Sequence, residues 1–412
     1  MKDTIILLTN EWPYGKKETF LENEVYKYNT EWEKFYCLPF IFHNGIKRNS
    51  NQYEIINNKY HINKVVALTR GILTIDFWQE LKQIITENKI SKNSILELLR
   101  FTMYTMQRHY ELKQFIKEGK INLNTSVLYS YWMASDAVAL SLLKKEYKNM
   151  NFITRCHGFD LYEERHAGNY IPYRNIIIKS ADLILPISKN GLDYLKNKYV
   201  SRKEVISKIR ISRLGTTDHG VGPNNIEHPF RMVSCSNVVP IKRINMIVNV
   251  LRRLDIDVEW IHFGDGPLLD DLKIAAKNLP KNIKVDFKGR ISNKELMKWY
   301  KENHVDIFVN VSASEGIPVS IMEAASFGIP IIATDVGGTR EIVTNNKNGF
   351  LIENRNVEEE LFEDIKKVYL MPCKIKNSFR LNSRKIWQNF GSATINYEKF
   401  YKTIWQFYNS KN

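Results

Sequence analysis

The sequence of residues 315–323 is EGIPVSIME, in which two carboxylates, those of Glu315 and Glu323, stand eight positions apart. Pro318 suits the first turn of a helix and favours an extended conformation at the residue before it. Backbone N–H groups at a helix start bind anions, and here they belong to Gly316, Ile317, Val319 and Ser320. If the whole stretch were helical, the carboxylates would be about 12 Å apart. This spacing predicts a cradle for a nucleotide sugar, with hydroxyl groups at both ends and a diphosphate between them.

The surrounding sequence predicts the fold. Gly328 and Pro330 end the helix that carries Glu323, and a strand follows them. Short β-branched runs alternate with amphipathic stretches throughout, which is typical of parallel sheets with crossover helices. The expected strands are Thr4–Thr9, Lys34–Phe40, Ser126–Tyr131, Phe152–Cys156, Leu183–Ile187 and Ile209–Leu214, then Met232–Ser236, Val258–Phe263, Ile283–Phe287, Ile307–Val311, Ile331–Thr334 and Phe350–Ile352. We therefore predict an α/β protein with two doubly wound sheets.

A chain of 412 residues is too long for one hydrophobic core and fits two domains. The segment Gly215–Pro229 is polar and rich in Gly, Pro and Asn, as linkers are. We expect a Rossmann-like domain over residues 1–220 and a second over residues 230–385, with a ligand cleft between them. Residues 386–412 are expected to form a helix that packs back on the first domain, because Ser392–Tyr408 has apolar residues at helical spacing.

Composition excludes several classes of protein. The hydrophobic content of 43% is that of a globular chain, and no apolar stretch approaches the ~20 residues that cross a bilayer. The N-terminal run lacks a small-residue cleavage site, so we interpret it as a first strand and not a signal peptide. The four cysteines are scattered without metal-ligand spacing, which favours a reducing cytoplasm.

The formal net charge of +15 calls for an anionic partner or for a solvated, lysine-rich surface, and the sequence leaves both open. Basic residues gather near aromatic ones in the first half, as shown by Lys113, Lys117, Lys120, Lys144, Lys145 and Lys148. An anionic membrane surface, on the inner face of the cell membrane, would suit this half. Nucleic acid is not expected, because no compact basic cluster or nucleic-acid motif is present.

A second motif lies in the second half. Lys242 and Arg243 follow the strand Met232–Ser236 and precede an amphipathic helix over Asn245–Leu254. Cations between a strand's carboxyl end and a helix N-terminus are well placed for a diphosphate. The alternative is a solvated basic turn.

Other candidate residues also follow expected strands. His157 and Asp160 come after Phe152–Cys156, and a histidine there can donate to a sugar hydroxyl. Gly15 follows the first strand and allows close approach of the backbone. Arg290 and Ile291 follow Ile283–Phe287 and are expected near a nucleotide base.

A metal site is not expected. Asp255 and Asp257 have the spacing with which some sugar transferases hold a divalent cation on a diphosphate. They lie between a basic helix and a strand, with no Gly or Pro nearby, and we interpret them as a surface turn.

Taken together, these motifs resemble the retaining glycosyltransferases of family 4, which have the two-Rossmann GT-B fold. The resemblance spans residues 1–412 and is densest from Met232 to Ile352, through SASEGIPVSIMEAASFGIPIIATDVGGTREIV, FGDGPLLDDL and FKGRISNKEL. The stretches ETFLENEV and HGFDLYEERHAGNYIPYR are similar to the branch that builds capsule, exopolysaccharide and lipid-linked oligosaccharide.

The resemblance implies roles for these residues. Glu315 would bind donor-sugar hydroxyls and Glu323 the ribose hydroxyls, while Lys242 would hold the diphosphate. His157 would line the sugar pocket, and Ile291 would contact the base through its backbone. The family's usual arginine five positions before the lysine is Asn237 here, which leaves Arg243 as the substitute cation, and the family's paired glycines in the first loop are reduced to Gly15.

The resemblance implies a metal-independent hexosyl transfer from a nucleotide sugar, by default a UDP-sugar, to a glycan or lipid-linked acceptor. The base, sugar, acceptor and linkage remain open. Two alternatives also remain. A GT-B epimerase would isomerise the donor sugar, and a non-catalytic GT-B subunit would support a partner transferase.

Overall fold

The computed structural model describes residues 2–409 except 16–17, 26–31, 42–47, 49–51, 58–59, 167, 200–205 and 225–228. The chain divides into two compact units. Unit 1 comprises Met1–Ser212 together with Tyr397–Asn412, and unit 2 comprises Arg213–Asn396. Part of the expected linker, residues 225–228, lies outside the described residues.

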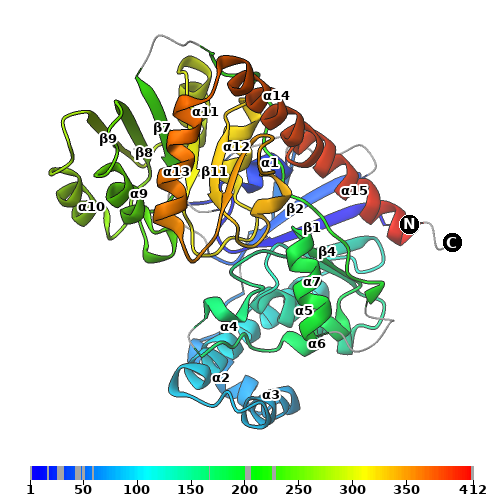
Figure 1. Ribbon diagram of the computed structural model, residues 1–412. Coiled ribbons are helices and arrows are strands. Elements are labelled where there is room, and N and C mark those ends of the chain that lie inside the picture. The colour runs from blue at the N-terminus through cyan, green and yellow to red at the C-terminus, as the bar shows by residue number, and fades with distance from the viewer. Residues whose placement is uncertain are drawn as a thin grey trace. The chain divides into compact units, whose positions relative to one another are not determined.

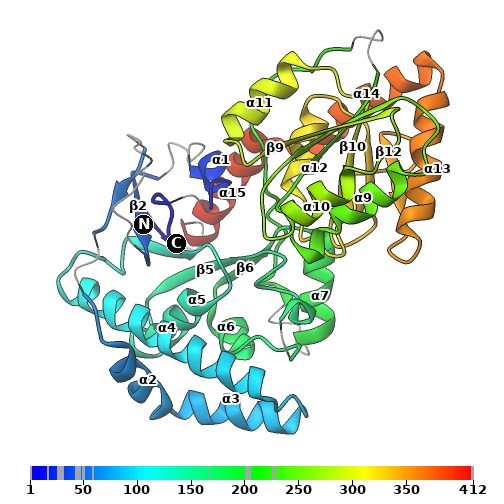
Figure 2. The same ribbon diagram turned by 90° about the vertical axis from the view of Figure 1, so that its left-hand side faces the viewer.

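Unit 1 contains a six-stranded parallel sheet with the order β3-β2-β1-β4-β5-β6. Its strands are β1 (Thr4–Thr9), β2 (Lys34–Pro39), β3 (Glu54–Ile55), β4 (Ser126–Ser130), β5 (Asn151–Cys156) and β6 (Leu183–Pro186). Its helices are α1 (Leu21–Val25), α2 (Lys64–Ile72), α3 (Ile75–Thr86), α4 (Lys92–Lys117), α5 (Ser135–Glu146), α6 (Arg174–Ser180), α7 (Lys189–Tyr199) and the short 3-10 helix η1 (Glu163–Arg165). Helices α4, α5 and α6 cover one face of the sheet (Figures 1 and 2).

The last helix, α15 (Ala393–Asn409), packs on the other face of this sheet. Successive side chains of a strand point to opposite faces, so Leu128 of β4 joins the core with α5 while Tyr129 faces α15. The Tyr129 ring lies 5.3 Å from that of Phe400, and the indole of Trp32 donates to the carbonyl of Tyr401 at 3.2 Å. These contacts confirm the predicted return of the C-terminal helix to the first domain.

Unit 2 contains a second six-stranded parallel sheet, with the order β12-β11-β10-β7-β8-β9. Its strands are β7 (Phe230–Cys235), β8 (Val258–Phe263), β9 (Ile283–Gly289), β10 (Ile307–Asn310), β11 (Ile331–Thr334) and β12 (Gly349–Ile352). Its helices are α9 (Ile244–Leu251), α10 (Leu269–Ala276), α11 (Asn293–Glu302), α12 (Val319–Ser326), α13 (Val357–Leu370), α14 (Cys373–Phe390) and the 3-10 helices η2 (Pro240–Lys242) and η3 (Thr339–Glu341). Helices α9, α10 and α13 cover one face, and α11, α12 and α14 cover the other (Figures 1 and 2).

The predicted fold class is confirmed, and eleven of the twelve expected strands overlap strands of the structure within two residues at each end. The expected strand Ile209–Leu214 is not one, because it pairs with β6 only at the single bridge between Ile209 and Ile184. Irregular bonds continue beside it, for example from the N–H of Ser212 to the carbonyl of Pro186. Strand β3, only two residues long, was missed because so short a run gives no alternating pattern.

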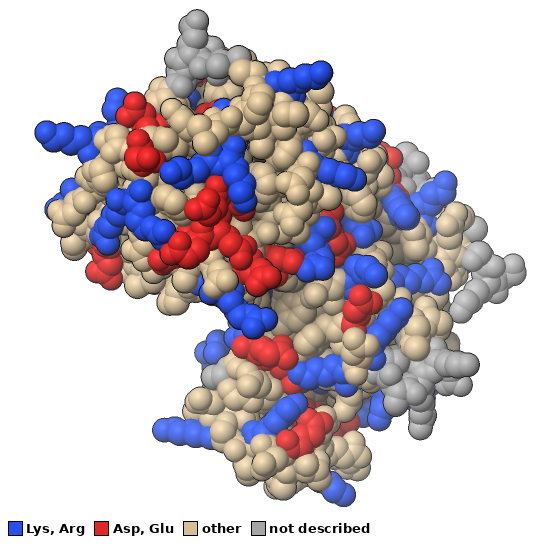
Figure 3. Space-filling view, in the orientation of Figure 1, with Lys and Arg blue, Asp and Glu red and all other residues tan. Residues whose placement is uncertain are grey.

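Charged side chains of both signs are interspersed on the face shown in Figure 3. Four of the six lysines singled out in the first half form ion pairs, namely Lys113 with Glu146, Lys120 with Glu118, Lys144 with Asp182 and Lys145 with Asp76. Three of these four pairs join lysines to acidic residues of other elements, and an anionic partner for this half of the chain stays a prediction. Among the described residues, no helix is both long enough and apolar enough to span a bilayer.

Candidate functional site

The site in unit 2 lies where the strand order of its sheet reverses. The chain passes from β7 outward through β8 to β9 and then returns to the other side of β7, where it forms β10. Loops that follow adjacent strands on either side of such a switch point diverge and leave a crevice at the carboxyl edge. Lys242 follows β7 and Glu315 follows β10, so the topology brings together two motifs that are far apart in sequence.

The two side chains meet directly. The ammonium Nζ of Lys242 lies 2.5 Å from Oε1 of Glu315, and the Asn310 amide Nδ2 lies 3.4 Å from the same oxygen. Glu315 is buried, while the Lys242 side chain keeps 23% of its surface exposed. The pair therefore combines a fixed carboxylate with a cation that reaches solvent.

Helix α12 begins four residues after Glu315. Its first helical residue is Val319, and Pro318 is the N-cap with ψ 106°, so the Glu315–Pro318 segment is not helical. The estimate of about 12 Å for a continuous helix is therefore wrong, because Pro318 and the extended backbone delay the helix. No side chain caps α12. The N–H groups of Val319 and Ser320 have no acceptor within the helix and are suited to an anion.

The backbone of this loop is fixed by a glycine turn after β11. The N–H of Gly338 donates to the carbonyl of Gly316 at 2.8 Å. Gly337 has φ +56°, and a Cβ built on it would lie 1.8 Å from the carbonyl oxygen of Glu315. Only glycine permits this approach, so the turn holds Glu315 and Gly316 in place. Ile317, next in the loop, is buried.

Glu323 lies inside α12 and is buried. Its Oε1 accepts a hydrogen bond from Nδ2 of Asn293 at 2.6 Å. Burial raises the pKa of the Glu323 carboxyl to about 7, although the bond from Asn293 lowers it. Burial, and then the charge of Glu323, raise the pKa of the Cys235 thiol at the end of β7. The charge of Lys242 lowers this pKa.

Arg243 is hydrogen-bonded to the loop after β10. Its guanidinium donates to the carbonyls of Val311 and Ser312 at 2.8 and 3.1 Å, and to Oδ1 of Asn354 at 2.7 Å. It therefore ties the loop after β10 to the start of α9. Donor binding by Arg243 stays a prediction, and these bonds give the side chain a structural role as well.

Arg290 and Ile291 follow β9, as expected. Arg290 is exposed and Ile291 is half-buried. The next residue, Ser292, caps α11, whose first residue is Asn293, the partner of Glu323. The predicted contact of Ile291 with a base stays a prediction.

In unit 1 the strand order reverses between β1 and β4. The carboxylate of Glu18 accepts backbone N–H groups from Glu11 and Trp12, both at 2.9 Å, and the Trp132 indole N–H at 2.5 Å. This carboxylate thus joins the loops after β1 and β4. Gly15, in the same loop, has φ +72°, and a Cβ there would lie 3.0 Å from the carboxylate carbon of Glu11.

His157 follows β5 at the same edge of the sheet. Its ring is buried against those of Tyr131 and Trp132, with centroids 4.7 and 4.5 Å away. Its Nδ1 lies 3.6 Å from Oδ2 of Asp160, and its Nε2 has no hydrogen-bond partner among the described residues. Buried polar atoms are normally satisfied, so an unsatisfied one indicates a binding position. Asp160 accepts the backbone N–H groups of His157 at 2.5 Å and Met133 at 2.7 Å.

Asp160 therefore orients the His157 loop. Burial acts to raise the pKa of the Asp160 carboxyl, but its bonds and charge interaction with His157 and the Met133 N–H group leave it lowered. Direct donor binding by Asp160, predicted from its position, stays a prediction.

A cavity of about 370 Å³ opens beside these loops in unit 1. Its walls come from the ends of β1, β2, β4 and β5 and from α4, and are mainly apolar and aromatic. The lining includes Asn10, Phe40, Arg100, Phe101, Tyr104, Trp132, Met133, Asp136, Phe159, Asp160 and His166. Aromatic faces with a few polar groups are typical of sites for amphipathic ligands.

Asp255 and Asp257 are both exposed, and Asp255 lies 3.5 Å from the ammonium of Lys366. Within the described ranges, no group of three or more His, Cys, Asp or Glu side chains is arranged to hold a metal ion.

Sequence reasoning missed four of these residues. Asn293 and Asn310 touch the two glutamates, and Glu18 and Trp132 join two loops. Glu18 lies in the loop after the first strand, and its sequence, Glu-Thr-Phe, fits the start of a helix equally well. Asn293 and Asn310 gave no signal in the sequence, since the glutamates that they contact lie 30 and 5 residues away.

Comparison with known proteins finds similar glycosyltransferases. Residues 222–386 match the model of the family "Glycosyl transferases group 1". The chain is 25% identical over 206 residues, 48% of its length and 50% of the relative's, to a putative colanic acid biosynthesis glycosyltransferase, WcaL, of Escherichia coli K12. The chain spans about half the length of the curated relatives it matches.

Two solved structures share its fold. The lipopolysaccharide outer core galactosyltransferase WaaB, in its apo form, has a TM-score of 0.68 at 15% identity and covers 99% of this chain and 100% of its own. HepE of Anabaena in complex with UDP-glucose has a TM-score of 0.63 at 14% identity, with coverage of 97% and 99%. At these identities the likeness shows the fold alone, which is GT-B.

Proposed function

We propose that this chain, whose residues 222–386 match the group 1 glycosyltransferases, moves a hexose from a nucleotide diphosphate sugar to a glycan or lipid-linked acceptor. We further propose that the reaction retains the anomeric configuration, needs no metal and serves cell-surface polysaccharide synthesis. The similarity to WcaL, a putative colanic acid biosynthesis glycosyltransferase, and to WaaB, a lipopolysaccharide outer core galactosyltransferase, supports this direction.

One observation carries the proposal: the Lys242–Glu315 pair at the switch point of unit 2, beside the uncapped start of α12. An ammonium donates three hydrogen bonds, and one of them goes to Glu315. The others can be given to a diphosphate, which the N–H groups of Val319 and Ser320 would also bind. Glu315 is then beside the sugar that the diphosphate carries.

Glu323 is proposed to bind the ribose. A buried carboxylate is stabilised by donors, and its second oxygen can accept a ribose hydroxyl while Asn293 holds the first. Ile291 and Arg290, which precede the helix of Asn293, are proposed to border the base. We propose a UDP-sugar as the donor, and the HepE complex with UDP-glucose supports that choice.

The chemistry is proposed to rest on charge stabilisation. Positive charge develops on the sugar as the diphosphate leaves, and preorganised donors stabilise the departing charge. Lys242 and the start of α12 would supply them. His157, whose Nε2 has no hydrogen-bond partner among the described residues, is proposed to hold a sugar hydroxyl or the acceptor. The aromatic cavity of unit 1 is proposed to receive the acceptor.

The proposal is tested by NMR, which monitors the fate of the nucleotide-sugar donor. The chain is incubated with UDP-glucose and other UDP-, GDP- and ADP-sugars, after a thermal-shift screen selects the nucleotide that raises the melting temperature. Hydrolysis or transfer with retained configuration supports the proposal. Appearance of an isomeric nucleotide sugar would instead identify an epimerase. Binding with neither hydrolysis nor transfer to any glycan or lipid-linked acceptor would identify a non-catalytic subunit.

A further inference from the structure

Helices α2 and α3 form a hairpin between β3 and β4 in unit 1. The hairpin lies on the side of α4 away from the sheet in both views (Figures 1 and 2). Gly71 of α2 packs so closely on α4 that a Cβ there would lie 2.2 Å from the Thr102 methyl group. On α3, Phe77 and Ile84 face inward and join the core.

The outward face of α3 is also apolar. Ile75, Trp78 and Ile85 are 75%, 57% and 55% exposed, and Leu73, at the turn between the helices, is exposed as well. Positions 75, 78, 82 and 85 fall on one side of a helix, opposite positions 77 and 84. A surface helix normally turns its second face to water with polar residues, so this apolar stripe indicates a partner.

The exposed charges of the hairpin are mostly positive. Over residues 64–87 they are Lys64, Arg70 and Lys82, together with Glu87 at the end of α3, which pairs with Lys89 at 2.8 Å. Two acidic residues of the hairpin, Asp76 and Glu80, contact other parts of unit 1. Asp76 pairs with Lys145 at 2.5 Å, and Glu80 is buried, where it accepts the Tyr170 hydroxyl at 2.7 Å. An apolar stripe that includes Lys82, on a hairpin whose exposed charges are mostly cationic, matches a surface that is apolar inside and anionic at its boundary.

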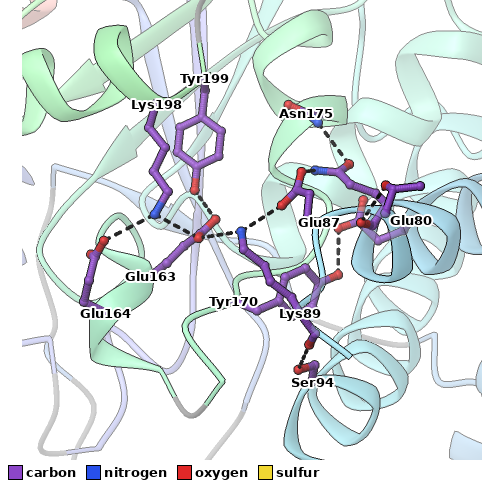
Figure 4. Close-up of polar contacts among 12 residues, drawn as sticks. Glu80, Glu87, Lys89, Ser94, Glu163, Glu164, Tyr170, Asn175, Lys198 and Tyr199 are labelled. Carbon is purple, nitrogen blue, oxygen red and sulfur yellow. Dashed lines mark hydrogen bonds and ion pairs between the residues drawn. The ribbon is translucent and has the colours of Figure 1, made fainter. Parts of the chain in front are cut away.

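The stripe is presented on a rigid support (Figure 4). Lys89, in the turn after α3, and Lys198 of α7 both lie 2.9 Å from Oε2 of Glu163. Asn175 of α6 donates to Gln83 of α3 at 3.0 Å. These bonds join α3 to α6, α7 and η1, so its outward face has a fixed orientation within unit 1.

We propose that the outward face of the α2–α3 hairpin docks on an anionic lipid bilayer, with α3 lying in the plane of the interface. Leu73, Ile75, Trp78 and Ile85 would enter the headgroup and acyl boundary, and Lys82, in the same stripe, would reach the anionic headgroups. Docking does not depend on the proposed glycosyl transfer. It would also bring α4, which exposes Leu96 and lines the aromatic cavity with Arg100 and Phe101, close to lipid-linked molecules.

The test is flotation of the full chain with vesicles of phosphatidylglycerol and phosphatidylcholine, compared with phosphatidylcholine alone. We expect binding to the anionic vesicles that weakens with salt. The double variant I75S/W78S should bind at least about tenfold more weakly, since it removes two of the apolar side chains that would enter the bilayer. Lys82→Glu should weaken binding to anionic vesicles only.

The matched control is I274S/L381S, which removes two exposed apolar side chains of unit 2 and should float like the wild type. Circular dichroism and melting temperature verify that each variant is folded, and Ile85→Ser gives a second, milder variant. Failure of the wild type to float, or equal flotation of I75S/W78S, would overturn the proposal. So would concentration-dependent self-association that I75S/W78S abolishes, because the stripe would then be an interface between copies. Donor hydrolysis, measured without vesicles, should be unchanged in all variants.

Discussion

The ammonium of Lys242 lies 2.5 Å from a carboxylate oxygen of Glu315, across 73 residues of sequence and at the switch point of the second sheet. We expect Lys242→Ala to lower kcat by about 30- to 900-fold, which corresponds to about 2–4 kcal/mol of lost stabilisation of the leaving group. Donor affinity should change less, because the start of α12 and Glu323 remain.

Steady-state kinetics with the selected nucleotide sugar measure both quantities. Lys298→Ala is the control, since Lys298 is a well-exposed lysine of unit 2 on α11. Full activity of Lys242→Ala would remove Lys242 from the proposed chemistry.

Nucleotide binding should depend on pH through Glu323. The carboxyl, with a pKa of about 7, is largely protonated below that pH and then accepts fewer hydrogen bonds. We expect affinity to rise between pH 6 and 8 (about one pH unit on either side of that pKa). Glu323→Gln should lose this rise. The comparison of the two proteins separates Glu323 from titration of the nucleotide itself, and parallel curves would contradict the assignment.

The same carboxyl affects stability. Its pKa in the folded state is raised above the ordinary value, so its contribution is present at low pH and is lost as pH rises toward 7. Chemical denaturation at several pH values should show Glu323→Gln gaining stability relative to wild type as pH increases through this window. No relative change between the two proteins would show that Glu323 is not a buried ionisable group.

Arg108 supports the loops of unit 1. Its buried guanidinium donates to Asp136 and Glu111, both at 2.9 Å, and to the carbonyls that end β1 and β2. Arg108→Met leaves two carboxylates without their cation and should cost about 3–5 kcal/mol of unfolding free energy. Arg355→Met, at an exposed position, should cost almost nothing. Equal denaturation midpoints for the two variants would contradict this role.

Phe101, in the wall of the aromatic cavity, should contribute to acceptor binding. Phe101→Ser is expected to raise the KM for the acceptor by about 2- to 12-fold, the range for loss of one aromatic contact. Donor hydrolysis in the absence of acceptor serves as the internal control and should not change. A raised KM for the donor with an unchanged KM for the acceptor would place the acceptor elsewhere.

Metal removal is a further test. We expect activity to persist in excess EDTA, because Lys242 and the start of α12 are proposed to stabilise the diphosphate. Activity that disappears in EDTA and returns with added Mg²⁺ would contradict the metal-independent reaction.

Local sequence signals predicted most of the fold and part of the site. Strands such as Val258–Phe263 are apolar runs bounded by clear breakers, and Lys242 and Glu315 each follow one, so sheet topology brings them together. The helical spacing of Ser392–Tyr408 likewise predicted α15 almost to the residue.

Other features depend on partners that no local pattern reveals. The carboxylate of Glu18 binds an indole 114 residues away, and the direction of Arg243 is decided by carbonyls after β10. Helix α12 begins only after Pro318, and not at Glu315, because the backbone of Glu315 packs against the Gly337 turn. Likewise, Lys113, Lys144 and Lys145 pair with acidic residues of other elements, which no local pattern shows.

The central claim, that unit 2 binds a nucleotide sugar through Glu323 and the Lys242–Glu315 pair, is tested most directly by calorimetric titration of UDP, GDP and ADP. We predict that one nucleotide binds the wild type with a single site and that Glu323→Ala weakens it at least about tenfold, as expected for loss of a charged hydrogen bond. Glu302→Ala, which removes an exposed glutamate of α11, should bind like the wild type. Undiminished binding by Glu323→Ala, or no binding of any of the three nucleotides by the wild type, would contradict the account.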